Sequence, residues 1–148
     1  MNIPVVLSSL RNAGLAKKPF ARVPLSKLNL HLLDLLYTEG FISGYSIQQH
    51  KYQVRVQLTY SGTELPLVSS LKSISRPGSR TYVRYSELLK RYSGRFLILS
   101  TCFGLTTGTT AIMNKCGGEL YALRYYFLYF VLKIVLISFK FYVKKFEF

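Results

Sequence analysis

The sequence predicts an α+β fold, in which an N-terminal αβαββ half packs against a mostly β C-terminal half with a short helix, followed by a C-terminal extension. Three observations lead to this prediction. Two apolar stripes of helical period lie in the first 40 residues, a segment of strict two-residue alternation follows them, and the rest consists of short apolar runs between glycines and prolines. Helical and alternating periods distinguish amphipathic helices from half-buried strands.

The first expected element is a short helix. Pro4 suits an initial helical turn, and Val6 and Leu10 belong to a pattern of helical spacing that Gly14 ends. A basic loop follows, and then a short extended piece over residues 20–23.

A second helix is expected over residues 27–38. Ser26 directly precedes it and is a suitable N-cap, because a serine hydroxyl accepts hydrogen bonds from the free amides of a helix N-terminus. The leucines of this segment form one stripe, and Gly40 is well placed to end the helix.

Two strands are expected next, over residues 41–47 and 52–60. In the second of them one face carries apolar side chains and the other carries polar ones. Such alternation is typical of an antiparallel hairpin with one buried face. The apolar positions are Val54, Val56, Leu58 and Tyr60.

The second half contains shorter elements. Arg-Pro-Gly at residues 76–78 predicts a turn, because proline supplies a fixed φ and glycine a positive one. A loop of small residues is expected over residues 101–108. The expected strands are residues 67–74, 81–85, 96–100 and 119–123, and the expected short helices are residues 86–91 and 109–114.

Basic residues greatly outnumber acidic ones. The chain has 20 lysines and arginines against 6 acidic residues, which gives a formal charge of +14. Self-repulsion of this size opposes folding and is usually tolerated because a polyanion neutralises it. Nucleic acid and an anionic membrane are the two candidates, and a merely solvated surface is the bland alternative. The basic residues fall in three groups nearly free of acids, from Arg11 to Lys27, from Lys72 to Arg95 and from Arg124 to Lys145.

No arrangement of residues predicts catalysis. Asp34 is the single aspartate, His31 and His50 stand alone, and no nucleotide-binding or nucleophile motif occurs. Cys102 and Cys116 lack the spacing and the second pair of a zinc site, so no metal, cofactor or small-molecule substrate is expected. The two cysteines are expected to be buried in a reducing compartment, and a disulfide between them is the open alternative.

Two segments suit contact with RNA. The predicted turn places Arg76, Arg80 and Arg84 around its Pro-Gly pair, with Tyr82 between them. Arginine forks onto phosphate or stacks on bases, and tyrosine stacks and donates a hydrogen bond. The loop at residues 100–104, Ser-Thr-Cys-Phe-Gly, sets small hydroxyl side chains beside a glycine, which lets a backbone approach RNA closely. Each segment alone is equally compatible with an ordinary surface loop.

With these residues the sequence resembles the eighth-numbered family of small-subunit ribosomal proteins. The resemblance implies the two halves described above, no enzymatic activity, binding to the central domain of small-subunit rRNA, and contact with neighbouring small-subunit proteins. Six segments correspond in the family's order: residues 10–13 (LRNA), 24–28 (PLSKL), 39–42 (EGFI), 74–82 (ISRPGSRTY), 100–104 (STCFG) and 117–119 (GGE).

The resemblance also implies which residues contact RNA. The segment at residues 100–104 corresponds to the family's central RNA-contacting loop, Tyr82 and Glu119 correspond to the surface beside it, and Lys27 and the arginine-rich turn correspond to phosphate contacts. The implied RNA-binding residues are Lys27, Arg76, Arg80, Tyr82, Arg84, Ser100, Thr101, Cys102, Phe103, Gly104 and Glu119.

The central loop departs from the family pattern at two positions. Cys102 replaces a hydroxyl, and Phe103 stands where lysine is frequent. Because a thiol is a weak hydrogen-bond donor, either Phe103 stacks in place of the lost contact or the RNA itself differs. The helix at residues 109–114 also lacks the family's charged residues and is expected to be short or irregular.

The N-terminus and the composition suggest a location. Residues 1–22 are poor in acids and superficially similar to a mitochondrial transit peptide. The correspondence of residues 10–13 with the family's first helix instead assigns them to the fold and leaves no room for a cleavable presequence. Heavy use of Phe, Tyr, Ile, Leu and Lys suggests an A+T-rich gene. We therefore expect a protein made inside the mitochondrion and located in the small ribosomal subunit of the matrix.

A boundary near Pro66 divides the chain into expected domains at residues 1–66 and 67–124, with an extension at residues 125–148. The extension is nearly all Phe, Tyr, Leu, Ile, Val and Lys. One alternative is a membrane anchor, but Lys133 interrupts the apolar run, and a lysine at the centre of a span costs about 3 kcal/mol. The preferred interpretation is a segment docked on neighbouring ribosomal proteins and rRNA.

Overall fold

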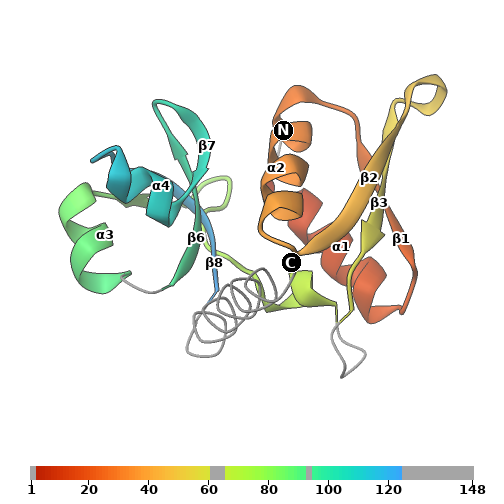
Figure 1. Ribbon diagram of the computed structural model, residues 1–148, viewed down its shortest axis with the longest axis horizontal. Coiled ribbons are helices and arrows are strands. Elements are labelled where there is room, and N and C mark those ends of the chain that lie inside the picture. The colour runs from red at the N-terminus through yellow and green to blue at the C-terminus, as the bar shows by residue number, and fades with distance from the viewer. Residues whose placement is uncertain (1–2, 61–65, 93–94, 125–148) are drawn as a thin grey trace, which may run out of the picture.

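The computed structural model describes residues 3–60, 66–92 and 95–124 and confirms the α+β class. Figure 1 shows two halves, each built of helices packed on an antiparallel sheet. The extension at residues 125–148 lies outside the described residues, so both interpretations of it stay predictions. Within the described ranges, no helix has the length and apolar character needed to cross a bilayer.

The N-terminal half has the αβαββ order that was predicted. Its strands pair antiparallel in the order β1-β3-β2, and both helices cover the same face of this sheet (Figure 1). Its elements are α1 Ile3–Leu15, β1 Phe20–Pro24, α2 Lys27–Thr38, β2 Ile42–Gln48, a 3₁₀ turn Gln49–Lys51 and β3 Gln53–Leu58.

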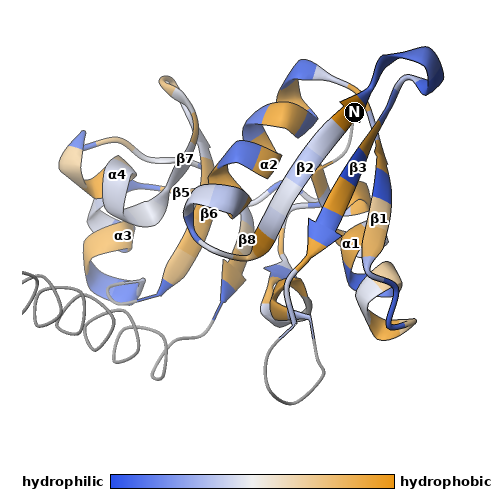
Figure 2. Cartoon of the chain, turned by 45° about the vertical axis from the view of Figure 1, so that its right-hand side comes forward, coloured by the Kyte–Doolittle hydropathy of each residue, from blue (hydrophilic) through white to orange (hydrophobic). Residues whose placement is uncertain are grey.

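Local signals in the sequence account for this half. Val54 and Val56 are fully buried under the helices, whereas the residues between them face outward, and Figure 2 shows this alternation along β3. The amide of Asn29 donates a hydrogen bond to the Ser26 hydroxyl at 3.2 Å, which confirms the expected N-cap of α2. Gly40 follows α2 with a φ of +84°, a conformation that glycine adopts without steric strain.

The C-terminal half is a second antiparallel sheet with two short helices on one side (Figure 1). Its strand order is β4-β8-β6-β7, and β5 pairs with β8 beyond β4. Its elements are a 3₁₀ turn Leu67–Ser70, β4 Lys72–Ser73, β5 Tyr82–Val83, α3 Tyr85–Arg91, β6 Phe96–Thr101, β7 Gly104–Thr107, α4 Gly108–Met113 and β8 Gly118–Arg124.

Strand β6 is buried on both faces and joins the two halves. Phe96 and Ile98 pack into the core of the N-terminal half, whereas Leu97 and Leu99 pack into a second core with α3 and α4. The ring of Phe96 lies 4.9 Å from that of Phe41, centroid to centroid. A continuous apolar run is what a strand covered on both faces requires. The face of the second sheet that carries Ile98 therefore looks towards the N-terminal half.

The predicted strand at residues 67–74 is wrong over most of its length. The chain instead makes the 3₁₀ turn, and pairing with β8 is confined to β4. Val68 and Leu71 are three residues apart and both reach the N-terminal core. A turn of three residues brings such positions to one side, whereas a strand would place them on opposite faces. Both lie beyond Pro66, and the domain boundary there stays a prediction.

The predicted loop at residues 101–108 is also wrong. Its second half is strand β7, which pairs with β6, and only Cys102 and Phe103 lie between the paired residues Thr101 and Gly104. Leu105 packs against the N-terminal core, so tertiary contact recruits this small-residue segment into the sheet. The strand expected at residues 81–85 is shortened to β5, because α3 begins at Tyr85.

Candidate nucleic-acid interface

Three of the predicted RNA-binding residues form one row across the second sheet. Ser100 of β6 pairs with Glu119 of β8, and Glu119 pairs in turn with Tyr82 of β5. Directly paired residues project from the same face of a sheet. Ser100 lies two residues beyond Ile98, so this row is on the face that looks towards the N-terminal half. We call Tyr82, Ser100 and Glu119 the central row.

Two consecutive glycines allow this row to form. A Cβ atom on Gly117 would lie 2.4 Å from the carbonyl oxygen of Val83, and one on Gly118 would lie 2.1 Å from that of Ser100. Real Cβ atoms essentially never approach an oxygen so closely. The pair Gly117-Gly118 therefore lets β8 enter between β5 and β6, which places Glu119 in the centre of the row.

The Arg-Pro-Gly turn brings basic side chains to the edge of the row. Arg76 and Ser79 exchange two backbone hydrogen bonds, at 3.0 and 3.1 Å, and Gly78 has a φ of +85°. Directly after the turn, Nη1 of Arg80 lies 3.0 Å from Oε1 of Glu119. Arg76 and Arg80 are both exposed, so their guanidinium groups face solvent beside the central row.

Glu119 supports this arrangement and is itself poorly exposed. Its carboxylate accepts a 2.6 Å hydrogen bond from the hydroxyl of Ser75, which is buried, as well as the bond from Arg80. Burial alone would raise the pKa of Glu119, but the hydrogen bonds from Ser75 and Arg80, the Arg80 charge and a hydrogen bond from Tyr121 outweigh it and lower the pKa below its usual value. Because the carboxylate stays ionised and occupied, it orients Arg80.

Tyr121, on the same face as Glu119, extends this polar cluster. Burial first, and then the nearby Glu119 carboxylate, raise the pKa of its phenol. Neither Ser75 nor Tyr121 was among the residues predicted from the sequence. Ser75 lies inside the ISRPGSRTY segment, and Tyr121 lies two positions after Glu119 in a strand, so their placement beside known candidates was the available signal.

The tip of the β6–β7 hairpin carries the remaining loop residues. The Thr101 hydroxyl accepts a hydrogen bond from the amide of Phe103 and donates one to the carbonyl of Gly104, both at 3.2 Å. Gly104 has a φ of +97°, which favours glycine. The Thr101 side chain therefore shapes the turn. Phe103 is 68% exposed and Cys102 is also exposed, so both present their side chains to solvent.

The expectation that both cysteines are buried is wrong. Cys102 is exposed, Cys116 is half-buried, and their Sγ atoms lie 3.8 Å apart as free thiols. Burial and the neighbouring Cys102 thiol raise the pKa of Cys116. The hairpin tip and the segment before β8 are thus in side-chain contact. No cluster of ligands for a metal ion occurs among the residues that the structure describes.

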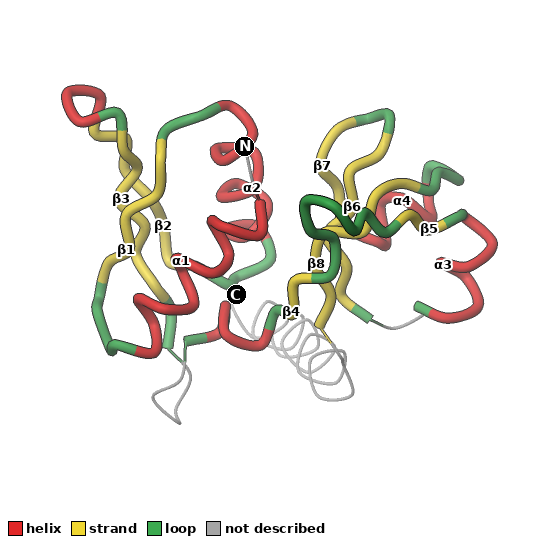
Figure 3. The backbone as a smooth tube through the Cα atoms, turned by 180° about the vertical axis from the view of Figure 1, so that it is seen from behind, coloured by secondary structure: helices red, strands yellow, loops and turns green. Residues whose placement is uncertain are grey.

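The other basic candidates lie at the rim. Arg84, at the N-terminus of α3, and Lys27, the first residue of α2, are exposed, as is Tyr82. Figures 1 and 3 show the N-terminus of α2 and the tip of the β6–β7 hairpin at the same end of the molecule, on either side of the space between the two halves. The structure therefore places Lys27 on the opposite half from the remaining candidates but at their end of the protein.

Comparison with known sequences gives consistent matches over the described fold. The family model described as "Ribosomal protein S8" matches residues 2–125. The chain is 36% identical over 119 residues to the small ribosomal subunit protein uS8 of Acholeplasma laidlawii (strain PG-8A), which covers 79% of this chain and 91% of that protein. It is 38% identical over 118 residues to the uS8 protein of Geotalea uraniireducens (strain Rf4), covering 78% and 89% respectively. Small ribosomal subunit protein uS8c of Cyanophora paradoxa is 37% identical over 118 residues, covering 77% and 89%.

Proposed function

This chain belongs to the ribosomal protein S8 family, and on that basis we propose that it is a structural constituent of the small ribosomal subunit that binds the central domain of small-subunit rRNA. The family consists of structural ribosomal proteins and not of enzymes. The partners are accordingly rRNA and neighbouring small-subunit proteins, and no small-molecule substrate or cofactor is part of the proposal.

One observation carries the proposal most directly. Tyr82, Ser100 and Glu119 come from three segments far apart in the sequence, and strand pairing aligns them in the central row. A hydroxyl, a phenol and an arginine held by a carboxylate then share one surface. Unpaired bases are recognised by stacking and by hydrogen bonds to their edges, whereas phosphates are bound by arginine. This set of groups supplies both kinds of contact.

The geometry suggests a division of roles. The exposed arginines of the turn and its flank, together with Lys27, contact phosphates, whereas Tyr82 and Phe103 stack on bases. Ser100 and the Gly104 backbone approach base edges or 2′-hydroxyls. Thr101 and Glu119 act mainly by holding the turn and Arg80 in place. Cys102 contributes little to binding because a thiol is a weak donor.

We also propose that the protein acts in a mitochondrial ribosome. The composition supports this proposal, with 12 tyrosines, 10 phenylalanines and no tryptophan in a chain of 148 residues. The extension at residues 125–148 is proposed to dock on neighbouring subunit components. Its deletion should reduce incorporation into the small subunit in a co-sedimentation assay, and unchanged incorporation would contradict a docking role.

Binding to small-subunit rRNA tests the function itself. Arg80→Ala should weaken binding to all RNAs, because it removes a phosphate contact and leaves Glu119 without its cation. Ser100→Ala should weaken binding selectively for the native rRNA site, since it removes a contact to a base or a 2′-hydroxyl. Affinity should fall steeply as salt rises. Lys72→Gln, which removes one exposed charge outside the candidate residues, is the control. Equal affinity for native rRNA and for unrelated RNA would refute the proposal.

A further inference from the structure

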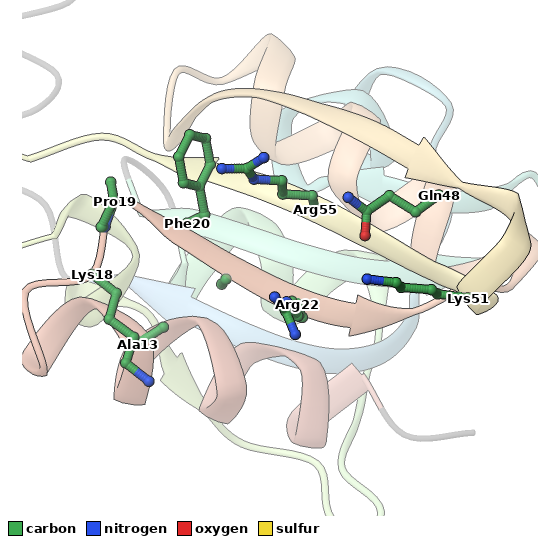
Figure 4. Close-up of a pocket in the computed structure, with 9 residues that line it drawn as sticks. Ala13, Lys18, Pro19, Phe20, Arg22, Gln48, Lys51 and Arg55 are labelled. Carbon is green, nitrogen blue, oxygen red and sulfur yellow. The ribbon is translucent and has the colours of Figure 1, made fainter.

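The outer face of the N-terminal sheet is the side that α1 and α2 leave uncovered. It carries Phe20 and Arg22 on β1, Arg55 on β3 and Gln48 and Lys51 at the end of the β2–β3 hairpin, and we call these five residues the outer sheet face. They line a hollow of about 620 Å³, which Lys18 also borders (Figure 4). Figures 1 and 3 show that this side of the sheet points away from the C-terminal half and its central row.

The charges on this face are unfavourable for the isolated protein. Arg22 of β1 pairs directly with Arg55 of β3, and both side chains are exposed. None of the three strands contains an aspartate or a glutamate. Like charges directly opposite each other destabilise a sheet. Figure 4 shows Lys51 reaching along the sheet towards Arg22, which concentrates positive charge further. An anionic partner would relieve this repulsion.

The same face offers a surface for stacking. The guanidinium carbon of Arg55 lies 3.6 Å from the centroid of the Phe20 ring, so the two planar groups form a cation–π pair. Phe20 is 37% exposed although it is aromatic, and Arg55 is exposed on its other side. A flat cation–aromatic pair beside lysine and arginine is the arrangement on which unpaired bases stack, and stacking of this kind tolerates any base.

We propose that the outer sheet face is a second RNA-binding surface that takes an unpaired RNA segment. Bases stack on the Phe20–Arg55 pair, and phosphates lie between Arg22 and Lys51. The neutral polar side chain at the rim, Gln48, can hydrogen-bond to base edges. The face lacks the cluster of large aliphatic side chains that anchors a protein partner or inserts into a lipid surface, and its charge complements a phosphate chain.

Photocrosslinking tests this surface directly in the full-length protein. The probe is a fluorescent oligouridine that contains 4-thiouridine, and crosslinked peptides are mapped by mass spectrometry. We expect crosslinks on the peptides that contain Phe20 and Arg55. Crosslinks confined to residues 76–104 would overturn the proposal.

Variants give the affinity. Arg22→Gln combined with Arg55→Gln should weaken oligouridine binding about tenfold and reduce the salt slope by about 0.7 for each lost phosphate contact. Phe20→Leu keeps an apolar side chain but removes the ring, and should weaken binding by about tenfold through lost stacking. Circular dichroism confirms that the variants are folded.

Matched controls keep the outcome specific. Lys90→Gln with Arg91→Gln removes the same charge from exposed sites on α3, and Tyr37→Leu removes an exposed ring from α2. If the outer-face variants bind oligouridine like these controls, or if they lose binding to phosphatidylserine vesicles and not to oligouridine, the proposal is refuted. Because Arg80 and Ser100 lie on the other half, either result leaves their test of the proposed function intact.

Discussion

Replacement of Gly118 by alanine tests whether close approach of three strands builds the candidate interface. The added Cβ would lie 2.1 Å from the Ser100 carbonyl oxygen and 2.9 Å from its carbonyl carbon. These are backbone atoms in the middle of a sheet, so no side chain can rotate away. Strands β6 and β8 must therefore separate by about 1 Å to restore ordinary contact, which is the overpacking that destabilises proteins by about 1–3 kcal/mol.

Loss of pairing adds to this effect. Separation at Gly118 weakens the neighbouring hydrogen bonds between β6 and β8, each worth about 1 kcal/mol net. We therefore expect Gly118→Ala to lower the free energy of unfolding by about 2–4 kcal/mol, measured by urea denaturation of the full-length protein. It should also weaken rRNA binding of the folded fraction, because Glu119 is displaced from Ser100.

Gly44 provides the matched control for this prediction. It also lies in a strand, β2, but a Cβ atom there meets nothing within 4 Å. Gly44→Ala should therefore leave stability unchanged or raise it by up to about 1 kcal/mol, since alanine restricts the unfolded chain. If Gly118→Ala is as stable as Gly44→Ala and binds rRNA normally, the close approach does not limit the sheet and the reasoning is wrong.

Three further predictions concern the core, the carboxylate and the thiols. Phe96→Ala should destabilise the protein by about 3–5 kcal/mol in urea denaturation, because it empties a site shared by both halves, and a loss below 1 kcal/mol would contradict that shared core. The folded-state pKa of Glu119 is lowered, so its stabilising contribution is present above its unfolded pKa of about 4.3 and is lost as pH falls through the folded pKa; Glu119→Gln should flatten this acid-side loss of stability in thermal scans, and an unchanged profile would oppose it. Glutathione disulfide should link Cys102 to Cys116 by exchange, releasing two molecules of glutathione, and mass spectrometry of a digest should find the linked peptides in the wild type and not in Cys102→Ser.

The sequence by itself determined the N-terminal half. The serine cap, the leucine stripe and the terminal glycine of α2 act within a few residues of one another, and the alternation in β3 reports its one buried face. The Arg-Pro-Gly turn is equally local, since proline and glycine set its backbone angles. Six short segments in order also identified the family before any contact was known, and the excess of basic residues indicated a polyanionic partner.

Only the tertiary structure decided how the C-terminal half is assembled. The small-residue segment after Thr101 becomes β7 because β6 offers it backbone partners, and residues 67–70 become a 3₁₀ turn because two apolar side chains must reach one core. The central row, the contact between the two cysteines and the opposed Arg22 and Arg55 all depend on the register between strands that are distant in sequence. Register is a non-local property, set by the burial of whole faces and by close backbone approach, and no local pattern of residues specifies it.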